Sequence, residues 1–169
     1  MCRDPTISSL TTELFRLNGL LLGARDALVS DLDLSSARLQ VLGVIAGSAA
    51  SQSVAGVARD LGLSRQAVQR LADEMERGGF VRFETNPHHQ RAKLVLFSVK
   101  GRSAYEKAAR RLEPLSKKLK RGFTGKQIES AAGVLRVLRQ RLENISETGR
   151  ARHGAGLKKA PLRRSNKTP

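Results

Sequence analysis

Cysteine, histidine and tryptophan are scarce in this sequence: its 169 residues hold one cysteine, three histidines and no tryptophan. A single thiol, Cys2, cannot form a disulfide within the chain. Such a small supply of sulfur and imidazole excludes most metal and nucleophile constellations, and the adjacent His88 and His89 have no acidic or thiol companion at ligand spacing. Gly-rich phosphate loops and Ser-x-x-Lys patterns are also missing. We therefore expect no catalytic residue, no metal, no cofactor and no enzymatic activity.

Long apolar runs are missing as well. No segment is apolar enough over a sufficient length to cross a membrane, and Met1 to Leu10 lack the apolar core of a secretory signal. The composition, 40% hydrophobic and 27% charged, suits one globular domain with a sizeable core. We expect a cytoplasmic protein with no membrane partner.

Basic residues are abundant, and they are unevenly distributed. The net charge of +16 and the isoelectric point near 11.3 indicate a polyanionic partner. Residues 1–100 hold twelve basic and ten acidic residues, residues 101–147 hold twelve and five, and residues 148–169 hold seven and none. This last segment reads as a disordered basic tail, which could bind phosphates or serve only as a solubilising end.

A helix-turn-helix pattern begins at Ser53. Gly62 suits the end of a first helix because glycine adopts left-handed backbone angles freely, and Ser64 suits the N-cap of a second. Steeply crossing helices need a small residue such as Ala58 and buried apolar residues around it. We assign the inward positions to Val57, Leu61, Leu63, Val68 and Leu71.

The second helix, Ser64 to Arg77, has two chemically different faces. Apolar residues recur at spacings of three and four on one face, while the other is polar. Arginine can bind guanine O6 and N7 bidentately, and glutamine can do the same with adenine N6 and N7. We therefore predict that the second helix reads DNA through Ser64, Arg65, Gln66, Gln69 and Arg70. The alternative is an ordinary solvated face.

A hairpin should follow this helix after Gly78 and Gly79. Residues 80–84 and 92–99 have the β-branched, aromatic and leucine content of strands, and the segment between them is rich in turn-forming residues. A hairpin in this position is a wing, whose basic tip could enter the neighbouring minor groove. We assign DNA contacts in the wing to His88, His89, Arg91 and Lys93.

Long helices are predicted on both sides of this region. One runs over residues 7–29, a second follows Ser35 and Ser36, a third covers residues 102–123, and a last one begins at Thr124 with a capping box. Pro114 should kink or split the third helix. The last helix repeats apolar residues in alternating threes and fours, which fits either packing within the subunit or pairing with a second copy.

The segment from Leu63 to Gly101 resembles the MarR family of winged-helix transcription regulators. It carries Leu63-Ser64, Val68, Arg70-Leu71, Glu76 with Gly79, Arg91, and Leu94 to Gly101, in the family's order. It departs from the pattern at His89, where the family has an aspartate, and at Phe97-Ser98, which replaces Leu-Thr.

The resemblance implies a homodimer formed by the N- and C-terminal helices. On the apolar stripes of those helices, the predicted dimer contacts are Leu10, Leu14, Leu135, Leu138, Leu142 and Ile145. The resemblance also implies a pocket for a small aromatic effector, whose candidate lining residues are Phe15, Leu22, Leu39 and Tyr105. Each of those four also fits an ordinary core position.

The expected fold is mainly α with a small β wing: a winged helix-turn-helix domain plus N- and C-terminal dimerisation helices. We assign residues 1–34 to the N-terminal dimerisation helix, 35–100 to the DNA-binding domain, 101–147 to the C-terminal dimerisation helices and 148–169 to the basic tail. The predicted function is a sequence-specific regulator, a repressor on a pseudo-palindromic operator in the bacterial nucleoid, with release by a small ligand. An architectural DNA-binding protein and a winged-helix protein-interaction module are the alternatives.

Overall fold

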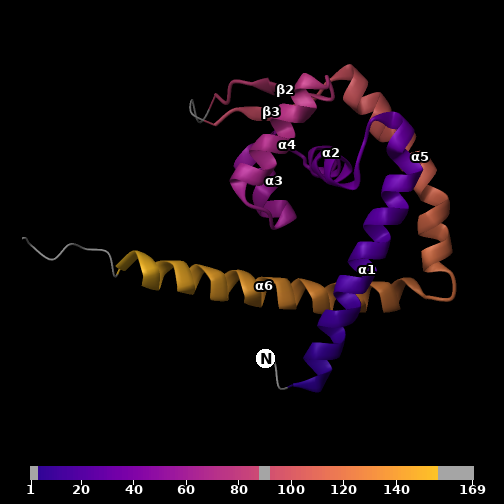
Figure 1. Cartoon of the computed structure of the whole chain (residues 1–169), viewed down its shortest axis with the longest axis vertical. Coiled ribbons are helices and arrows are strands. Elements are labelled where there is room, and N and C mark those ends of the chain that lie inside the picture. Colours follow the sequence, from indigo (N-terminus) through magenta and orange to yellow (C-terminus); the bar gives the residue numbers. More distant parts are fainter. Residues whose placement is uncertain (1–3, 88–91, 156–169) are drawn as a thin grey trace, which may run out of the picture. The chain divides into compact units, whose positions relative to one another are not determined.

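A computed structural model describes residues 4–87 and 92–155 of the chain. Its elements are α1 (Pro5–Val29), the 3-10 helix η1 (Ser30–Leu32), α2 (Ser36–Gly47), β1 (Gln52–Ser53), α3 (Val54–Leu61), α4 (Arg65–Arg77), β2 (Val81–Glu84), β3 (Leu94–Phe97), α5 (Val99–Lys120) and α6 (Gly125–Ala155). The fold is mainly helical with one small antiparallel sheet (Figure 1), which confirms the predicted class. The chain divides into two compact units between Leu119 and Lys120, so that α6 belongs to the second unit.

The first two helices begin at side-chain caps. Asp4 accepts a hydrogen bond from the Thr6 amide at 2.9 Å, and α1 then continues as the single long helix that its apolar repeat predicts. Ser35 caps α2. Ser36, which is buried, donates its hydroxyl to the Leu22 carbonyl at 3.0 Å and so fastens the start of α2 to α1.

The helix-turn-helix has the predicted turn. Gly62 ends α3 with φ of +65°, and the Ser64 hydroxyl accepts a hydrogen bond from the Ala67 amide at 3.1 Å at the start of α4. The inward assignment of Leu63 is wrong, because its side chain is 46% exposed. Its amide donates to the Ala58 carbonyl at 2.9 Å, so Leu63 lies in the turn beyond the helix end, where its side chain faces solvent.

The core lies where α2, α3 and α4 meet the sheet and the first turns of α5. Each fully buried Val, Leu, Met or Phe side chain contributes roughly 1.5–3 kcal/mol from removal of apolar surface from water. The largest fully buried side chains are Phe80, Leu42, Met75, Val29, Val41, Val57, Val68 and Val95. Of the predicted inward residues, Val57 and Val68 are therefore in the core, while Leu61 and Leu71 pack against it partly buried.

The sheet has three strands in the order β1-β3-β2, all antiparallel, whereas the sequence predicts only the β2–β3 hairpin. The additional strand, β1, has two residues, which pair as Gln52 with Val95 and Ser53 with Leu94. Both predicted strands are shorter in the structure. Phe80 is a core residue before β2, and the helix α5 already begins at Val99.

The wing and α5 meet at a tight backbone junction, made of Gly79, Phe80, Ser98 and Gly101. The Ser98 amide donates to the Phe80 carbonyl at 3.2 Å, and the Ser98 hydroxyl accepts from the Gly101 amide at 2.8 Å, which caps α5. A Cβ atom on Gly101 would lie 1.7 Å from the Phe80 carbonyl oxygen. Only glycine fits at this point of the junction.

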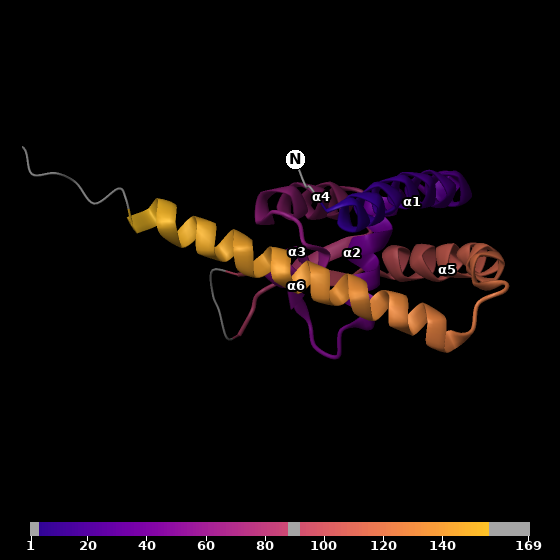
Figure 2. The same cartoon turned by 90° about the horizontal axis from the view of Figure 1, so that it is seen from below.

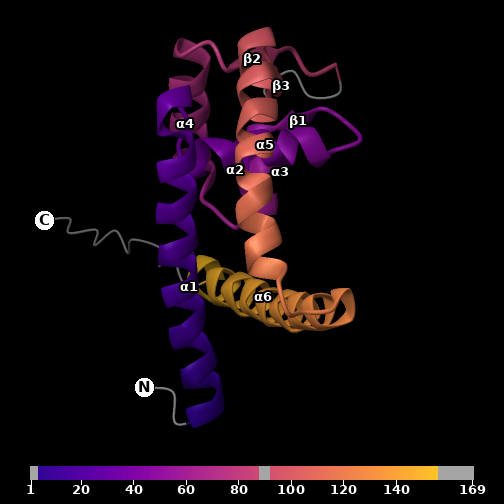
Figure 3. The same ribbon diagram turned by 90° about the vertical axis from the view of Figure 1, so that its right-hand side faces the viewer.

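Helix α5 passes through Pro114 as a single element and ends at Lys120, ahead of Gly122 with φ of +85°. Pro114 therefore does not split the helix, and the alternative, a kink at Pro114, stays a prediction. Figure 3 shows α1 and α5 running in opposite directions, one toward the helix-turn-helix and the other away from it. An ion pair between Asp31 and Arg111 joins α5 to η1.

The Asp31–Arg111 pair is sensitive to pH. The hydrogen bond from Arg111 lowers the pKa of the Asp31 carboxyl below its ordinary value, and the Asp31 carboxylate raises the pKa of Arg111. A lowered folded-state pKa favours folding above the unfolded-state value, and this contribution disappears as the pH falls through the folded-state value. The pair therefore favours folding at neutral pH and not in strong acid.

The predicted capping box opens α6. The Thr124 amide donates to Gln127 Oε1 at 2.9 Å, and the Gln127 amide donates to the Thr124 hydroxyl at 3.3 Å. Figure 2 shows α6 as one continuous helix. It continues to Ala155, through residues 148–155 of the segment predicted as a tail, and the rest of that segment lies outside the described residues.

Replacing Gly101 by alanine should destabilise the protein by about 3 kcal/mol or more, because the new methyl group would overlap the Phe80 carbonyl and displace α5. Urea denaturation measures this loss. The matched control is Gly43→Ala in α2, where a Cβ meets nothing within 4 Å and alanine favours helix by up to about 1 kcal/mol. Equal stabilities of the two variants would contradict the junction geometry.

Candidate nucleic-acid interface

The polar side of α4 is divided into two flanks by the helical repeat. Successive residues are rotated by about 100°, which places Gln66 and Arg70 on the flank farthest from the buried Val68 and Ala72. Arg65 and Gln69 lie between that outer flank and the core, on the side of the wing. The structure thus places four of the five predicted reader side chains on two flanks of one helix with different surroundings, while the fifth, Ser64, is the N-cap of that helix.

The outer flank is open to solvent. Gln66 and Arg70 are exposed, and within residues 4–87 and 92–155 neither side chain has a hydrogen-bond or ion-pair partner. Their donors and acceptors are therefore available to an incoming ligand. Arg77, about two helical turns beyond Arg70, instead donates from Nε to the Asp73 carbonyl at 3.4 Å.

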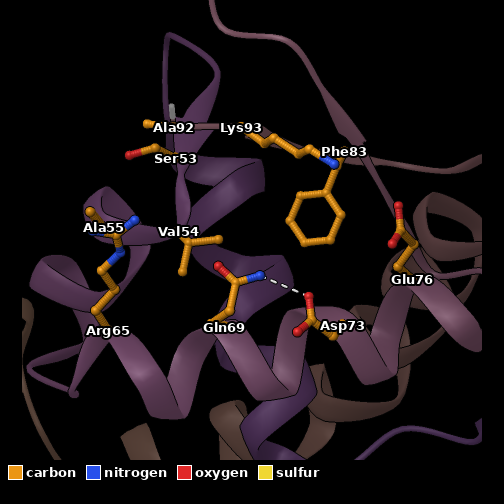
Figure 4. A pocket seen from close by; sticks show the side chains of 10 residues that line it. All are labelled: Ser53, Val54, Ala55, Arg65, Gln69, Asp73, Glu76, Phe83, Ala92 and Lys93. Carbon is orange, nitrogen blue, oxygen red and sulfur yellow. Dashed lines mark hydrogen bonds between the residues drawn. The ribbon is translucent and has the colours of Figure 1, made fainter. Parts of the chain in front are cut away.

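The wing-side flank borders a pocket of about 360 Å³ between α4, the start of α3 and the wing. Figure 4 shows its lining, which comes from three parts of the chain: Ser53, Val54 and Ala55; Arg65, Gln69, Asp73 and Glu76; and Phe83, Ala92 and Lys93. Two cationic and two anionic side chains share this lining. Such a pocket can present both hydrogen-bond donors and hydrogen-bond acceptors to a polar ligand.

One hydrogen bond in this pocket orders a predicted reader residue. Gln69 donates from Nε2 to Asp73 Oδ1 at 2.7 Å, four residues along the same helix, and both side chains are half-buried. Glutamine–aspartate pairs at this spacing stabilise a helix by about 0.2–0.5 kcal/mol. The sequence places Asp73 on the polar face of α4 but shows no role for it.

The wing is described only in part. Lys93 is exposed, and its Nζ lies 5.9 Å from the centre of the Phe83 ring. Arg82 is occupied within the hairpin, because it pairs with Glu84 and donates to the Phe97 carbonyl at 3.3 Å. The predicted contacts His88, His89 and Arg91 lie outside the described residues.

The residues predicted for a dimer interface lie on helix surfaces that this chain leaves uncovered. Leu10 and Leu14 of α1, and Leu135, Leu142 and Ile145 of α6, are exposed, whereas Leu138 is half-buried. Single chains seldom expose such regular apolar stripes without a partner. The two stripes lie in different compact units, with α1 in the first and α6 in the second.

The residues predicted for an effector pocket have dissimilar surroundings. Phe15 is 72% exposed on α1, Leu39 belongs to the core, Leu22 is half-buried, and the Tyr105 ring packs on Phe97 with 5.7 Å between ring centres. The pocket beside α4 includes none of them. The effector pocket stays a prediction.

The described residues hold neither a metal-ligand cluster nor a helix suited to crossing a membrane. No three His, Cys, Asp or Glu side chains among residues 4–87 and 92–155 gather as metal ligands would. In the same part of the chain, no helix combines the length and apolar character needed to cross a membrane.

Residues 32–92 match the sequence model of the MarR family, a region that holds α2, α3, α4, the first two strands and the turn after β2. Over this region the chain is similar to the MarR family. An uncharacterized protein of Mycobacterium bovis is 32% identical over 96 residues, which are 57% of this chain and 66% of that protein. The chain therefore spans just under two thirds of that relative's length.

Solved MarR-family structures share the fold. A mutant MarR from Escherichia coli in complex with operator DNA has a TM-score of 0.69 and 21% identity, covering 82% of this chain and 99% of that one. CouR from Rhodococcus jostii bound to p-coumaroyl-CoA has a TM-score of 0.67 and 23% identity, covering 76% and 90%. At these identities the likeness establishes the architecture.

Ser64 should contribute to stability through its cap. Ser64→Ala should lower the free energy of unfolding by about 1 kcal/mol because the Ala67 amide loses its acceptor. Ser64→Asp, which keeps a capping oxygen, should retain most of the stability. Thermal denaturation of both variants measures the difference, and an Ala variant as stable as the Asp variant would contradict the cap.

Proposed function

We propose that this chain is a transcription regulator that binds double-stranded DNA sequence-specifically, acting as a homodimer on a pseudo-palindromic operator. The observation that carries the proposal is the division of α4, whose one side is buried in the core while the other presents base-competent side chains. The activity is binding, without a catalytic step. Repression is the simplest outcome, because a dimer on an operator blocks access to the DNA beneath it.

The chemistry of α4 supports direct readout in the major groove. Arg70 on the outer flank can contact guanine through two donors, and Gln66 beside it can contact adenine through one donor and one acceptor. Arg65 and Gln69 extend this polar surface toward the wing. Arginine and glutamine at these positions suit base edges better than they suit an apolar protein partner.

The charge distribution favours a division between segments that bind phosphates and a segment that recognises bases. Residues 1–100 carry a net charge of only +2, whereas residues 101–147 and 148–169 each carry +7. Phosphate contacts supply affinity without sequence information, and base contacts supply specificity. We therefore assign most of the electrostatic attraction to the later segments, joined by the wing residues Arg91 and Lys93, and the reading to α4.

The exposed stripes of α1 and α6 support the homodimer. A two-fold dimer of helix-turn-helix domains places its two reader helices about one turn of DNA apart, which favours an operator with two-fold symmetry. A regulator of this kind works on the chromosome, so we propose a cytoplasmic protein located at the nucleoid.

Selection of operators from random duplexes tests the reading role. Wild-type protein should bind the selected duplex more tightly than a scrambled one in fluorescence-anisotropy titrations at two salt concentrations. Arg70→Ala should cost about 1–3 kcal/mol on the selected duplex and relax the preference, because a base contact is lost. Arg77→Ala, which removes the same charge from the same helix, should weaken both duplexes by a similar factor.

Three results would count against this proposal. Equal wild-type affinity for both duplexes would favour an architectural protein without sequence preference, and no binding to either would favour a protein-interaction module. If Arg70→Ala lowered the affinity for the selected and the scrambled duplex by the same factor, Arg70 would contact only phosphate.

The homodimer has its own test. At micromolar concentration the wild-type chain should sediment at about twice its 18.4 kDa mass. Leu135→Glu should shift it toward monomer by placing a charge in the stripe of α6, whereas Val137→Glu, exposed on the opposite side of α6, should not. Sedimentation of the wild-type chain only as monomer would exclude the dimer.

A further inference from the structure

We propose that Asp73 is a positioning residue for DNA recognition, which fixes the side-chain amide of Gln69 so that Gln69 selects adenine over guanine. The inference rests on the proposed function, since it needs α4 to face base edges. It adds a specificity-determining residue that is not itself a base contact.

The geometry is that of a side chain held in one orientation. The Gln69 amide nitrogen faces Asp73 Oδ1 at 2.7 Å, and Figure 4 shows the amide oxygen turned away from Asp73. Both side chains are half-buried at the pocket wall, where packing further limits their movement. Among the described residues, the Asp73 carboxylate accepts a hydrogen bond from Gln69 and from no other residue.

The chemistry of the pair dictates which end of the amide faces Asp73. An ionised carboxylate can only accept hydrogen bonds, so it attracts the amide nitrogen and repels the amide oxygen. One of the two amide hydrogens is then used, while the second hydrogen and Oε1 remain. One donor beside one acceptor is the set that adenine N7 and N6 require.

The same orientation disfavours guanine. Guanine presents two acceptors, O6 and N7, in the major groove, and a fixed Oε1 would face one of them. An unrestrained amide can rotate to offer its donors to either base. By fixing the amide, Asp73 makes Gln69 selective, and it also removes rotamer freedom before binding, which otherwise costs about 0.5–1.5 kcal/mol per side chain.

Asp73 should also oppose binding, because it places a negative charge near DNA phosphates, as Glu76 does in the same pocket wall. The two effects of Asp73 therefore have opposite signs: it lowers affinity for every sequence and raises discrimination between sequences. A side chain that merely stabilised α4 would change neither the selectivity nor the affinity of the folded protein.

The experiment compares Asp73→Ala with Asp73→Asn in the full chain. Both remove the charge, but only asparagine keeps an oxygen that can accept from Gln69. The probes are the selected duplex and the same duplex with guanine in place of the adenine read by Gln69. To identify that adenine, each adenine of the selected duplex is replaced in turn by its 7-deaza analogue. The adenine read by Gln69 is the one whose replacement weakens DNA binding by the wild-type protein but not by the Gln69→Ala variant.

Both Asp73 variants should bind scrambled DNA more tightly than wild type. Asp73→Asn should keep the adenine-over-guanine ratio of affinities within about twofold, whereas Asp73→Ala should lower it by about two- to tenfold. Glu76→Gln, which removes a charge from the same wall, should raise affinity and leave the ratio unchanged. Alanine is the strongest helix former, so α4 should persist, and Asp73→Ser provides a second variant without an acceptor in reach.

An unchanged ratio in Asp73→Ala and Asp73→Ser would overturn the positioning role while leaving the proposed function intact. An equal loss of the ratio in Asp73→Asn would also overturn it, because charge and not hydrogen bonding would then be responsible. If wild-type protein shows no preference for the selected duplex, the proposed function and this inference fail together.

Discussion

The start of α5 lies against the carbonyl of Phe80 at a distance that only glycine permits, and the geometry of the winged helix-turn-helix depends on this contact. A Cβ on Gly101 would lie 1.7 Å from that oxygen. Because the α4–β2 turn and the start of α5 meet here, α4, the hairpin strands and the long helix α5 have a fixed relation to one another. Ser98 adds to this by bonding the Phe80 carbonyl and capping α5.

Given this frame, α4 combines two kinds of polar surface. Gln66 and Arg70 are solvated and unpaired among the described residues, so no neighbouring side chain fixes their orientation before a ligand binds. Gln69 is held in one orientation by its hydrogen bond to Asp73, but Asp73 also adds a negative charge to this surface. A single helix thereby presents both adaptable and pre-oriented side chains, which complement each other in recognition.

The sequence predicts most helix boundaries because the residues that cap helices act locally. Gly62, Ser64 and Thr124 have the positions expected of them, since a turn or a cap involves only neighbouring backbone. The exposure of Leu63 and the pairing of β1 differ from the sequence-based prediction for the opposite reason. Whether a leucine beside a turn is covered, or a two-residue segment pairs with a distant strand, depends on tertiary partners.

The candidate site shows the same limit. Helical spacing is enough to place Arg65, Gln66, Gln69 and Arg70 on the polar side of α4 and to separate them into two flanks, but which flank borders the pocket depends on where the wing lies. Asp73 is recognisable as a partner of Gln69 only once the side chains are oriented. The dissimilar surroundings of Phe15 and Leu39 could not be inferred from periodicity, since both fit an apolar pattern.

The shortest strand has a mechanical consequence. Ser53 pairs with the central strand β3 and also caps α3 by accepting from the Gly56 amide at 3.2 Å, so one residue belongs to both the sheet and the helix-turn-helix. No hinge-like linker separates the two. Within the described residues, β3 therefore cannot shift relative to α3 without breaking either the pairing of Ser53 with Leu94 or the cap of α3.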